Sequence, residues 1–433
     1  MQRARGNELH NAAFDGVTQR MVALLSRGHI DIDQPNPQGL TPIMLAAFKG
    51  HLRIVRLLLS KGATVSGVAD DGFTALHAAV QEGHPAVTKL LVDAGADLEA
   101  RTLSQGYTPL YIASERGLLK VMSVLIEAGA NPNTRELESG ATPLYTAAQD
   151  GRVNAVKLLL RAKADPLLMA RPTRPAPEFA VAPVDVAAHN GHLGVVHELI
   201  QECGVKGCGG ASGGARALQV AAQEKHVHVM EMLTNAGVVD TGTALLTAAA
   251  IGHEAAVKLL LQQMKWTTRR ERAAYLNTHE PTGQTPLFAA IIRADFSSAR
   301  IVRLLADAGA DMASPVRIVN APRGIFFHDT ALAFANRFIS VKSFGGGRTT
   351  TEDELHSLKA SRRVLLRLEA VHATSWLWTS GAPSVAYAAA ESATGNQMTP
   401  VALMLPILRR RTGRPRVILA AMFRHSKKPS RLG

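Results

Sequence analysis

The chain has 433 residues, of which 46% are hydrophobic and only 5% are aromatic, so it can bury a large core built from Leu, Ala and Val. Its two cysteines, Cys203 and Cys208, are too few for a disulfide framework and favour a reducing compartment. The sequence has no run of eighteen apolar residues and no apolar signal segment near Met1. We therefore expect an intracellular protein without a membrane span, cytoplasmic or nuclear.

The net charge of +13 is concentrated at the C-terminal end of the chain. Residues 401–433 contain seven Arg, two Lys and no acidic residue, which leaves +4 for the other 400 residues. We expect residues 381–433 to form a flexible basic tail. The basic residues that define it are Arg409, Arg410, Arg411, Arg414, Arg416, Lys427 and Lys428. Such a tail is typical of an import signal or of a salt-sensitive contact with nucleic acid.

One pattern recurs along the chain: an anchor that is usually glycine, a mostly apolar position five places on, and a leucine eight places on. Most successive anchors are 33 or 34 residues apart. They are Gly16, Gly50, Gly83, Gly117, Gly151, Gly191, Lys225 and Gly252. A period near 33 residues indicates a stacked array of small units, each unable to bury its apolar face alone. We expect each anchor to start a helix, and the array to bind rather than to catalyse.

The segments between anchors are equally regular. Each holds a sequence such as Gly39-Leu40-Thr41-Pro42-Ile43, in which threonine caps a helix and proline fits its first position. An alanine pair follows, then a leucine run, and then a glycine whose left-handed conformation ends the second helix. These final glycines are Gly62, Gly95 and Gly129. Lys163 stands at the same place, which predicts a left-handed strain of about 1 kcal/mol.

The sequence resembles the ankyrin repeat family over residues 5–312. The resemblance implies an all-α solenoid of about eight repeats, in which helix–turn–helix pairs are joined by short β-hairpin fingers and form a concave recognition face. Two units depart from the family pattern. The unit at Arg216-Ala217-Leu218 lacks Thr-Pro, and the unit at Thr243-Ala244-Leu245 is shortened.

Three insertions interrupt the period. Residues 166–182 are rich in proline and predict an extended loop, residues 204–215 contain six glycines and predict a flexible connector, and residues 262–282 lengthen one hairpin. Residues 313–380 are expected to hold a degenerate repeat, starting near Thr330, and a capping helix. That helix would open at the capping box Thr351-x-x-Glu354 and cover the end of the array with one apolar stripe. The stripe comprises Leu355, Leu358, Leu365, Leu368 and His372.

Two sequence features suggest chemistry, and neither has a supporting scaffold. Gly210-Ala211-Ser212-Gly213-Gly214 matches a nucleophile elbow, but a glycine run rather than a core strand precedes it. His192, His197, Cys203 and Cys208 lack the tight spacing of a zinc site. Histidines recur directly after the anchors, which marks them as structural. We therefore expect no enzyme activity, no cofactor and no metal.

The resemblance implies that partner-binding positions flank the finger glycines and follow the alanine pairs. We therefore interpret the chain as a monomeric adaptor or scaffold that binds a partner protein on its concave face. The predicted binding residues are Leu40, Phe48, Lys49, Asp70, Asp71, Phe73, Gln81, Glu82, Gln105, Tyr107, Glu115, Arg116, Glu138, Ala141, Gln149 and Asp150.

Two alternatives remain open. One is a chromatin-associated protein that contacts nucleic acid through the tail, where Gly413-Arg414-Pro415 is similar to the core of an AT-hook. The other is a substrate adaptor of a ubiquitin ligase. In that case residues 405–416, which are similar to part of a SOCS box but lack its cysteine, would contact the ligase.

Overall fold

A computed structural model of the protein divides the chain into two compact units, unit 1 (Met1–Ala244) and unit 2 (Leu245–Gly433). The residues that it describes are 2–27, 30–171, 181–209, 214–263, 268–278, 284–293, 298–312, 316–320, 325–330, 335, 355–356 and 358–366.

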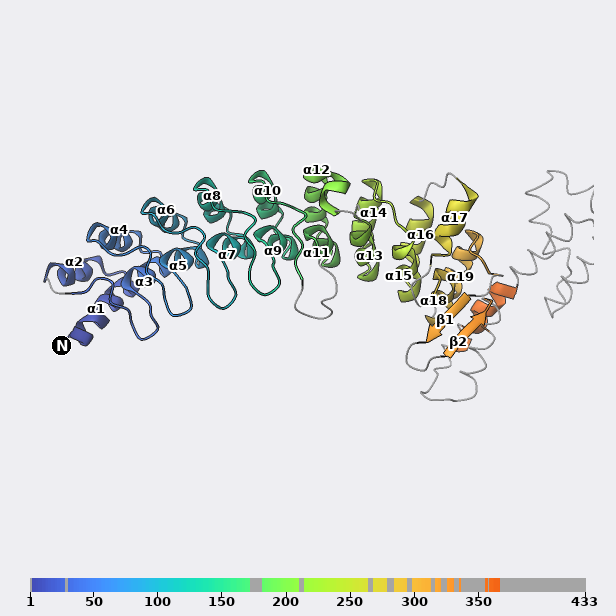
Figure 1. Cartoon of the computed structure of the whole chain (residues 1–433), viewed down its shortest axis with the longest axis horizontal. Helices are drawn as coiled ribbons and strands as arrows, with labels where there is room; N and C mark the ends of the chain where they lie inside the picture. The colour runs from blue at the N-terminus through green and yellow to red at the C-terminus, as the bar shows by residue number, and fades with distance from the viewer. Residues whose placement is uncertain are drawn as a thin grey trace, which may run out of the picture. The chain divides into compact units, whose positions relative to one another are not determined.

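Unit 1 consists of helix pairs that lie in two rows, and Figure 1 shows loops extending from the side of the first-helix row. The first helices are α1 (Gln2–Asp15), α3 (Pro42–Phe48), α5 (Ala75–Gln81), α7 (Pro109–Arg116), α9 (Pro143–Gln149), α11 (Pro183–His189) and α13 (Ala215–Gln223). The second helices are α2 (Thr18–Ser26), α4 (Leu52–Ser60), α6 (Pro85–Asp93), α8 (Leu119–Glu127), α10 (Val153–Arg161), α12 (Leu193–Gly209) and α14 (Val227–Asn235). We number the pairs repeats 1 to 7 in chain order.

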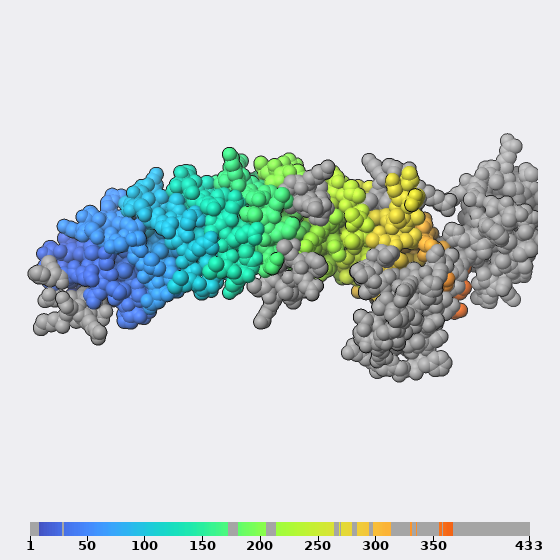
Figure 2. Space-filling model, viewed as in Figure 1, coloured from blue at the N-terminus to red at the C-terminus, as the bar shows by residue number. Residues whose placement is uncertain are grey.

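Each repeat packs on the repeats before and after it. Helix α3 contacts α5, which contacts α7, while α4 contacts α6 and α6 contacts α8. In Figure 2 the colours of unit 1 therefore follow one another in bands from blue to green. These neighbour contacts confirm the predicted all-α array of stacked helix pairs.

The first helices of repeats 3 to 5 begin at the predicted threonine caps. The side-chain oxygens of Thr74, Thr108 and Thr142 accept backbone N–H groups three residues on. Proline follows directly in α7 and α9, where no intrahelical partner for its missing N–H is needed. Local sequence thus fixes where these helices start, before any contact between repeats is made.

The second helices bury the two residues that recur after each anchor. Every one of these side chains is at most 4% exposed, so they form the core between the two helix rows. They are Met21, Leu24, Val55, Leu58, Thr88, Leu91, Met122, Leu125, Val156, Leu159, Val196, Leu199, Met230 and Leu233 in unit 1, and Val257 and Leu260 in unit 2. The polar member, Thr88, donates its hydroxyl to the His84 carbonyl oxygen at 2.9 Å, so its burial leaves no unsatisfied donor.

The anchors lie in the turn between the two helices of a repeat, rather than at the start of a helix as expected. All of them have positive φ, including Lys225 with a φ of 66°. Lys163, at the end of α10, has a φ of 62°, which confirms the left-handed conformation predicted there. Glycine adopts this conformation without a Cβ penalty, whereas lysine does not.

Replacing Lys163 or Lys225 with glycine should stabilise unit 1. Both side chains are exposed, so we expect a gain of about 0.5–1 kcal/mol at each site from relief of the left-handed strain. Urea unfolding followed by circular dichroism would measure it. Lys89, which is exposed inside α6, is the matched control, and Lys89→Gly should instead destabilise by about 1 kcal/mol. A loss of stability in K163G and K225G would contradict the strain argument.

A histidine that follows one anchor contacts the anchor of the preceding repeat. A Cβ on Gly50 would lie 2.6 Å from the His84 ring, whose Nε2 donates to the Phe48 carbonyl oxygen at 3.0 Å. The same pair of contacts links His51 to repeat 1, His192 to repeat 5 and His226 to repeat 6. In repeat 4 the histidine is replaced by Leu118, and Arg116 donates to the Gln81 carbonyl oxygen instead, at 2.5 Å.

This contact predicts that replacing two left-handed glycines of repeat 2 with alanine lowers stability by different amounts. Gly62→Ala meets no atom within 4 Å and should cost only the left-handed penalty of about 1 kcal/mol. Gly50→Ala must also displace His84 and break its hydrogen bond, which should cost roughly 1–2 kcal/mol more. Unfolding midpoints of the two variants would show the difference, and equal losses would rule out a role for the histidine contact in stability.

The structure adds detail to the first predicted insertion and revises the second and third. In residues 166–182, Ala170 and Val181 pair through two backbone hydrogen bonds of 3.0 and 2.7 Å, so this loop is an enlarged finger of repeat 6. The predicted flexible connector is partly helical, since α12 kinks at Gly204 and runs on to Gly209. The predicted longer hairpin at 262–282 contains α17 (Arg269–Leu276), which starts at a capping box formed by Thr268 and Glu271.

Unit 2 contains further helices and a hairpin. The helices are α15 (Thr243–Ile251), which begins two residues before the unit, α16 (Glu254–Gln263), α17, α18 (Pro286–Arg293) and α19 (Ser298–Asp307). Helix α19 packs on α16 and α18. Strands β1 (Val316–Asn320) and β2 (Ile325–Asp329) pair antiparallel, with Val316 opposite Asp329 and Asn320 opposite Ile325. This hairpin was not expected, because residues 313–380 were predicted to contain only a degenerate repeat and a capping helix.

Several predictions fall wholly or partly outside the described residues. In the capping-helix segment, residues 358–366 are helical and Leu358 and Leu365 are fully buried, while Thr351, Leu368 and His372 are not described. The basic tail with Arg409 to Lys428, and Ser212 of the elbow-like sequence, also lie outside. The proposed domain limits therefore stay predictions. Among the described helices, none is both long and apolar enough to cross a membrane.

Candidate functional site

The fingers of unit 1 are tight loops that lead into the first helices. The finger of repeat 3 closes with a hydrogen bond from Ala69 N to Phe73 O at 2.8 Å, and that of repeat 4 with one from Thr102 N to Tyr107 O at 3.1 Å. Each carries a left-handed glycine at its tip, Gly72 and Gly106. We call the fingers and the C-terminal ends of the first helices of unit 1 the inner face.

Neighbouring fingers are joined by backbone hydrogen bonds. Leu103 N donates to Asp71 O at 2.7 Å, Leu137 N donates to Gln105 O at 2.9 Å, and Arg171 N donates to Ser139 O at 2.8 Å. A Cβ on Gly72 would lie 2.7 Å from Arg101 O, so this close approach requires glycine. The fingers of repeats 3 to 6 are therefore held in one arrangement before any partner binds.

The carboxylate of Glu136 organises the finger of repeat 5. Burial alone would raise its pKa, but hydrogen bonds from Ser139, Ala141 and Glu138 hold the pKa below its ordinary value. The Glu138 and Ser139 N–H groups lie 2.6 and 2.5 Å from its oxygens. The Ser139 hydroxyl donates to the same carboxylate. An ionised carboxylate thus replaces part of the backbone pairing in this longer loop.

The predicted finger aromatics are half-buried because each stacks on its own first helix. Phe73 lies 5.3 Å from the His77 ring, and Tyr107 lies 4.5 Å from the Tyr111 ring, measured between centroids. Burial and the neighbouring Tyr107 raise the pKa of Tyr111, so its phenol is neutral across the physiological range. The stacking fixes both exposed ring faces, which lowers the entropy lost when a partner covers them.

Six of the predicted residues come together around one groove of about 600 Å³. It lies on repeats 1 to 3, between finger tips and first helices. The predicted residues in its lining are Leu40, Phe48, Asp70, Asp71, Phe73 and Gln81. Phe14 also lines the groove and is 43% exposed. Phe14 was not among the binding residues predicted from the sequence, although it stands two places before its anchor as Phe48 does.

The other predicted residues do not form part of this groove. Lys49, Glu82, Arg116, Glu138, Gln149 and Asp150 are exposed, and Gln105, Tyr107 and Glu115 are half-buried. The prediction for Ala141 was wrong, because this side chain is only 4% exposed and packs inside the finger. Burial and the nearby Asp150 carboxylate raise the pKa of Glu115, while Arg116 opposes that shift.

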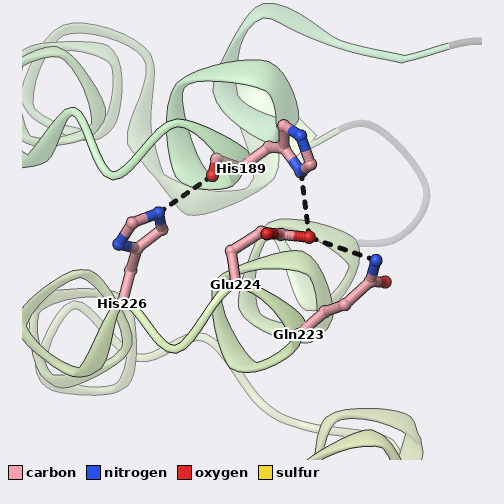
Figure 3. A network of polar contacts seen from close by, with 4 residues as sticks. All are labelled: His189, Gln223, Glu224 and His226. Atoms are coloured by element: carbon pink, nitrogen blue, oxygen red, sulfur yellow. Dashed lines mark hydrogen bonds and ion pairs between the residues drawn. The ribbon is translucent and has the colours of Figure 1, made fainter.

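The same positions carry polar groups farther along unit 1. In Figure 3 His226 Nε2 donates to the His189 carbonyl oxygen at 2.9 Å, and the His189 ring faces Glu224 with an Nδ1 to Oε1 distance of 3.6 Å. Gln223 Nε2 donates to the same carboxylate at 3.2 Å. The inner face therefore changes from aromatic at repeats 1 and 2 to polar at repeats 6 and 7.

Two of the residues that suggested metal chemistry, His192 and Cys203, have structural surroundings. Among the described residues, no three His, Cys, Asp or Glu side chains come together as a metal site would require. His192 Nε2 donates to the Gln149 carbonyl oxygen at 2.9 Å. Burial, together with the charges of Glu202 and Asp165, raises the pKa of the Cys203 thiol, which disfavours the reactive thiolate.

His77 links repeat 3 to the finger of repeat 4 from a fully buried position. Its Nδ1 accepts the Thr74 N–H at 3.3 Å, and its Nε2 donates to the Tyr107 carbonyl oxygen at 3.1 Å. Burial lowers the pKa of His77 below its ordinary value of 6.5. Protonation would therefore have to desolvate a charge and remove the acceptor that Thr74 uses.

Acidification should weaken unit 1 partly through His77. The unfolded chain takes up a proton near pH 6.5 while the folded ring resists it, so stability is lost as pH falls through that value. His77→Gln cannot be protonated and should lose less stability than the wild type between about pH 7.5 and about pH 5. Urea midpoints of both proteins at both pH values would test this. Identical pH dependence would exclude His77 as a contributor.

Comparison with known proteins identifies the class of fold. A family model described as ankyrin repeats in three copies matches residues 9–102 and 98–170. Residues 9–170 of the chain therefore consist of ankyrin repeats. It is similar to the mouse (Mus musculus) fibronectin type 3 and ankyrin repeat domains 1 protein, with 40% identity over 53 residues. The aligned segment is 12% of this chain and 15% of that relative. Ankyrin repeats generally mediate protein–protein interaction and are generally not enzymes.

Proposed function

We propose that the chain is a non-enzymatic adaptor that holds a partner protein on the inner face between residues 36 and 150. The observation that carries this proposal is the groove of repeats 1 to 3, which exposes aromatic rings of Phe48 and Phe73 beside charged finger residues. Aromatic anchors in a partly enclosed site beside polar groups are typical of residues that dominate binding energy.

The backbone bonds between fingers support the same proposal. Because Leu103 N and Leu137 N tie each finger to the preceding one, the loops need little ordering when a partner arrives. Their side chains are nevertheless exposed, Leu103 at 70% and Leu137 at 61%. Each side chain lies against the finger glycine of the preceding repeat, Gly72 or Gly106, and leaves most of its surface for a partner to cover.

Combined replacement of Phe73 and Tyr107 by alanine tests the proposal. Partners would be captured from a cell extract with the full chain, identified by mass spectrometry, and then titrated as purified proteins. The double variant should weaken direct binding by about 2 kcal/mol or more, which is roughly 30-fold. Circular dichroism should show unchanged helical content, because both rings lie on the finger surface and only stack on His77 and Tyr111.

Lys61→Ala and Asp93→Ala are the controls, since both residues are exposed at the C-terminal ends of second helices. They should leave the affinity nearly unchanged. If these variants abolished binding while the finger variant bound normally, the partner site would lie on the second-helix row and the proposal would fail.

A further inference from the structure

The aromatic floor of the groove is not required by the repeat architecture. Phe14 of α1 and Phe48 of α3 both stand two places before an anchor. In the later repeats of unit 1 the same place is polar, with Gln81, Glu115, Gln149, His189 and Gln223. The stacked array therefore folds with either kind of residue there. Two adjacent phenylalanines, one of them 43% exposed, indicate a local function of repeats 1 to 3.

One rim of the groove is acidic. Asp70 and Asp71 are exposed at the finger tip of repeat 3 and line the groove with Phe73. Asp71 Oδ1 accepts the Phe73 N–H at 3.0 Å, which fixes this carboxylate and leaves its other oxygen for a ligand. Within the described part of the chain, neither aspartate forms an ion pair with Lys or Arg. Among the described residues, both negative charges therefore lie beside an apolar floor without a salt bridge.

Among the described residues, the Lys49 ammonium group already lies over the aromatic floor of the groove. Lys49 Nζ lies 4.3 Å from the centroid of the Phe14 ring and 5.6 Å from that of Phe48. Its position shows that these rings can hold a cation, as expected from the negative face of an aromatic ring.

Acidic residues also predominate along the first-helix ends of unit 1. The last two positions before the anchors hold five acids, Asp15, Glu82, Glu115, Asp150 and Glu224. The bases there are Lys49 and Arg116, and Arg116 donates to the Gln81 carbonyl oxygen. Charges beyond about 8 Å are largely screened at physiological salt. The local acidity of the inner face therefore outweighs the net charge of +13 for a bound segment.

We propose that this groove binds a segment of a partner protein in which a large apolar side chain stands next to a Lys or Arg. The apolar side chain would lie on Phe14, Phe48 and Phe73, and the basic residue would pair with Asp70 and Asp71. A volume of about 600 Å³ admits more than one side chain, so it suits a peptide segment. This inference rests on the proposed function, because it names the chemistry of the partner on the same face.

Short fluorescent peptides provide a direct test on the full chain. Three sets would be titrated by fluorescence anisotropy: apolar residues beside Lys or Arg, the same apolar residues beside Asp or Glu, and polar residues beside Lys or Arg. The first set should bind best. Equal binding of the acidic set, or binding of the basic set without apolar residues, would overturn the proposal.

Two groove variants separate the charge from the apolar contribution. Asp70→Asn with Asp71→Asn removes both charges but keeps an oxygen for the Phe73 N–H, and it should weaken the first set about fivefold and reduce its salt dependence. Phe14→Ala should weaken the same peptides without unfolding the array, as the ring lies at the groove surface. Unchanged affinity in both variants would also overturn the proposal.

Matched controls lie on the second helices. Asp93→Asn removes an exposed acid from α6, and Leu119→Ala shortens an apolar side chain of α8 that is 37% exposed. Neither should change peptide binding.

The natural partner distinguishes failure of this inference from failure of the proposed function. If F73A/Y107A loses the captured partner while F14A and D70N/D71N retain it fully, the adaptor role stands and the groove chemistry is wrong. If all of these variants retain the partner, the proposed function fails as well.

Discussion

Stacking of unit 1 depends on the close approach of each repeat to the turn of the preceding one. Because glycine has no Cβ, the His84 ring can lie against Gly50 and donate to a carbonyl oxygen that the end of α3 leaves unpaired. In repeat 4, Leu118 and Arg116 take the place of the histidine, which shows what this contact requires. It needs a small anchor, a side chain that covers it and one donor, and it does not need histidine itself. A contact of this kind sets the spacing and orientation of successive repeats.

That contact and the buried second-helix positions hold the repeats together. The packing therefore does not constrain the residues at the outward ends of the first helices. Their chemistry then differs from repeat to repeat on an unchanged backbone. Phe14 and Phe48 make one end of the inner face apolar, whereas His189 and Gln223 stand at the equivalent positions and both contact Glu224 (Figure 3). The division between a repetitive interior and a variable face explains how one scaffold presents a specific surface. It also explains why the fold and the binding site depend on different residues.

The same division decided what could be predicted from the sequence. The left-handed Lys163 was predictable because backbone geometry at a repeat position is nearly independent of what lies around it. The left-handed Lys225 was not predicted, because the anchors were expected to start helices. Phe73 and Phe48 were both predicted to bind, because the first follows a finger glycine and the second follows an alanine pair. Phe14 was missed because binding residues were assigned only from Leu40 onward, although the anchor Gly16 already placed repeat 1 in the period. Ala141 was misassigned because it follows its finger glycine as Tyr107 does, yet its small side chain is only 4% exposed.

The irregular segments were harder because they have no repeat to follow. Helix α17 carries a local signal, since Thr268 and Glu271 form a capping box, yet residues 262–282 were interpreted as a lengthened hairpin. Strands β1 and β2 also carry one, as their β-branched and aromatic residues flank a Pro-x-Gly sequence at 322–324. In both segments the local secondary-structure preference agrees with the structure. The prediction nevertheless followed the expectation that the repeat continues.

The enlarged finger of repeat 6 has a consequence for how this chain tolerates change. Ala170 and Val181 close the loop at its base, and Arg171 N bonds to the finger of repeat 5, so both ends of the loop are fixed on the array. Lengthening a loop closed in this way costs only about 0.6 kcal/mol for each doubling of its length. The segment between these ends is therefore a permissive site, where residues can be gained or lost, or an epitope grafted, without shifting the register of the helices on either side.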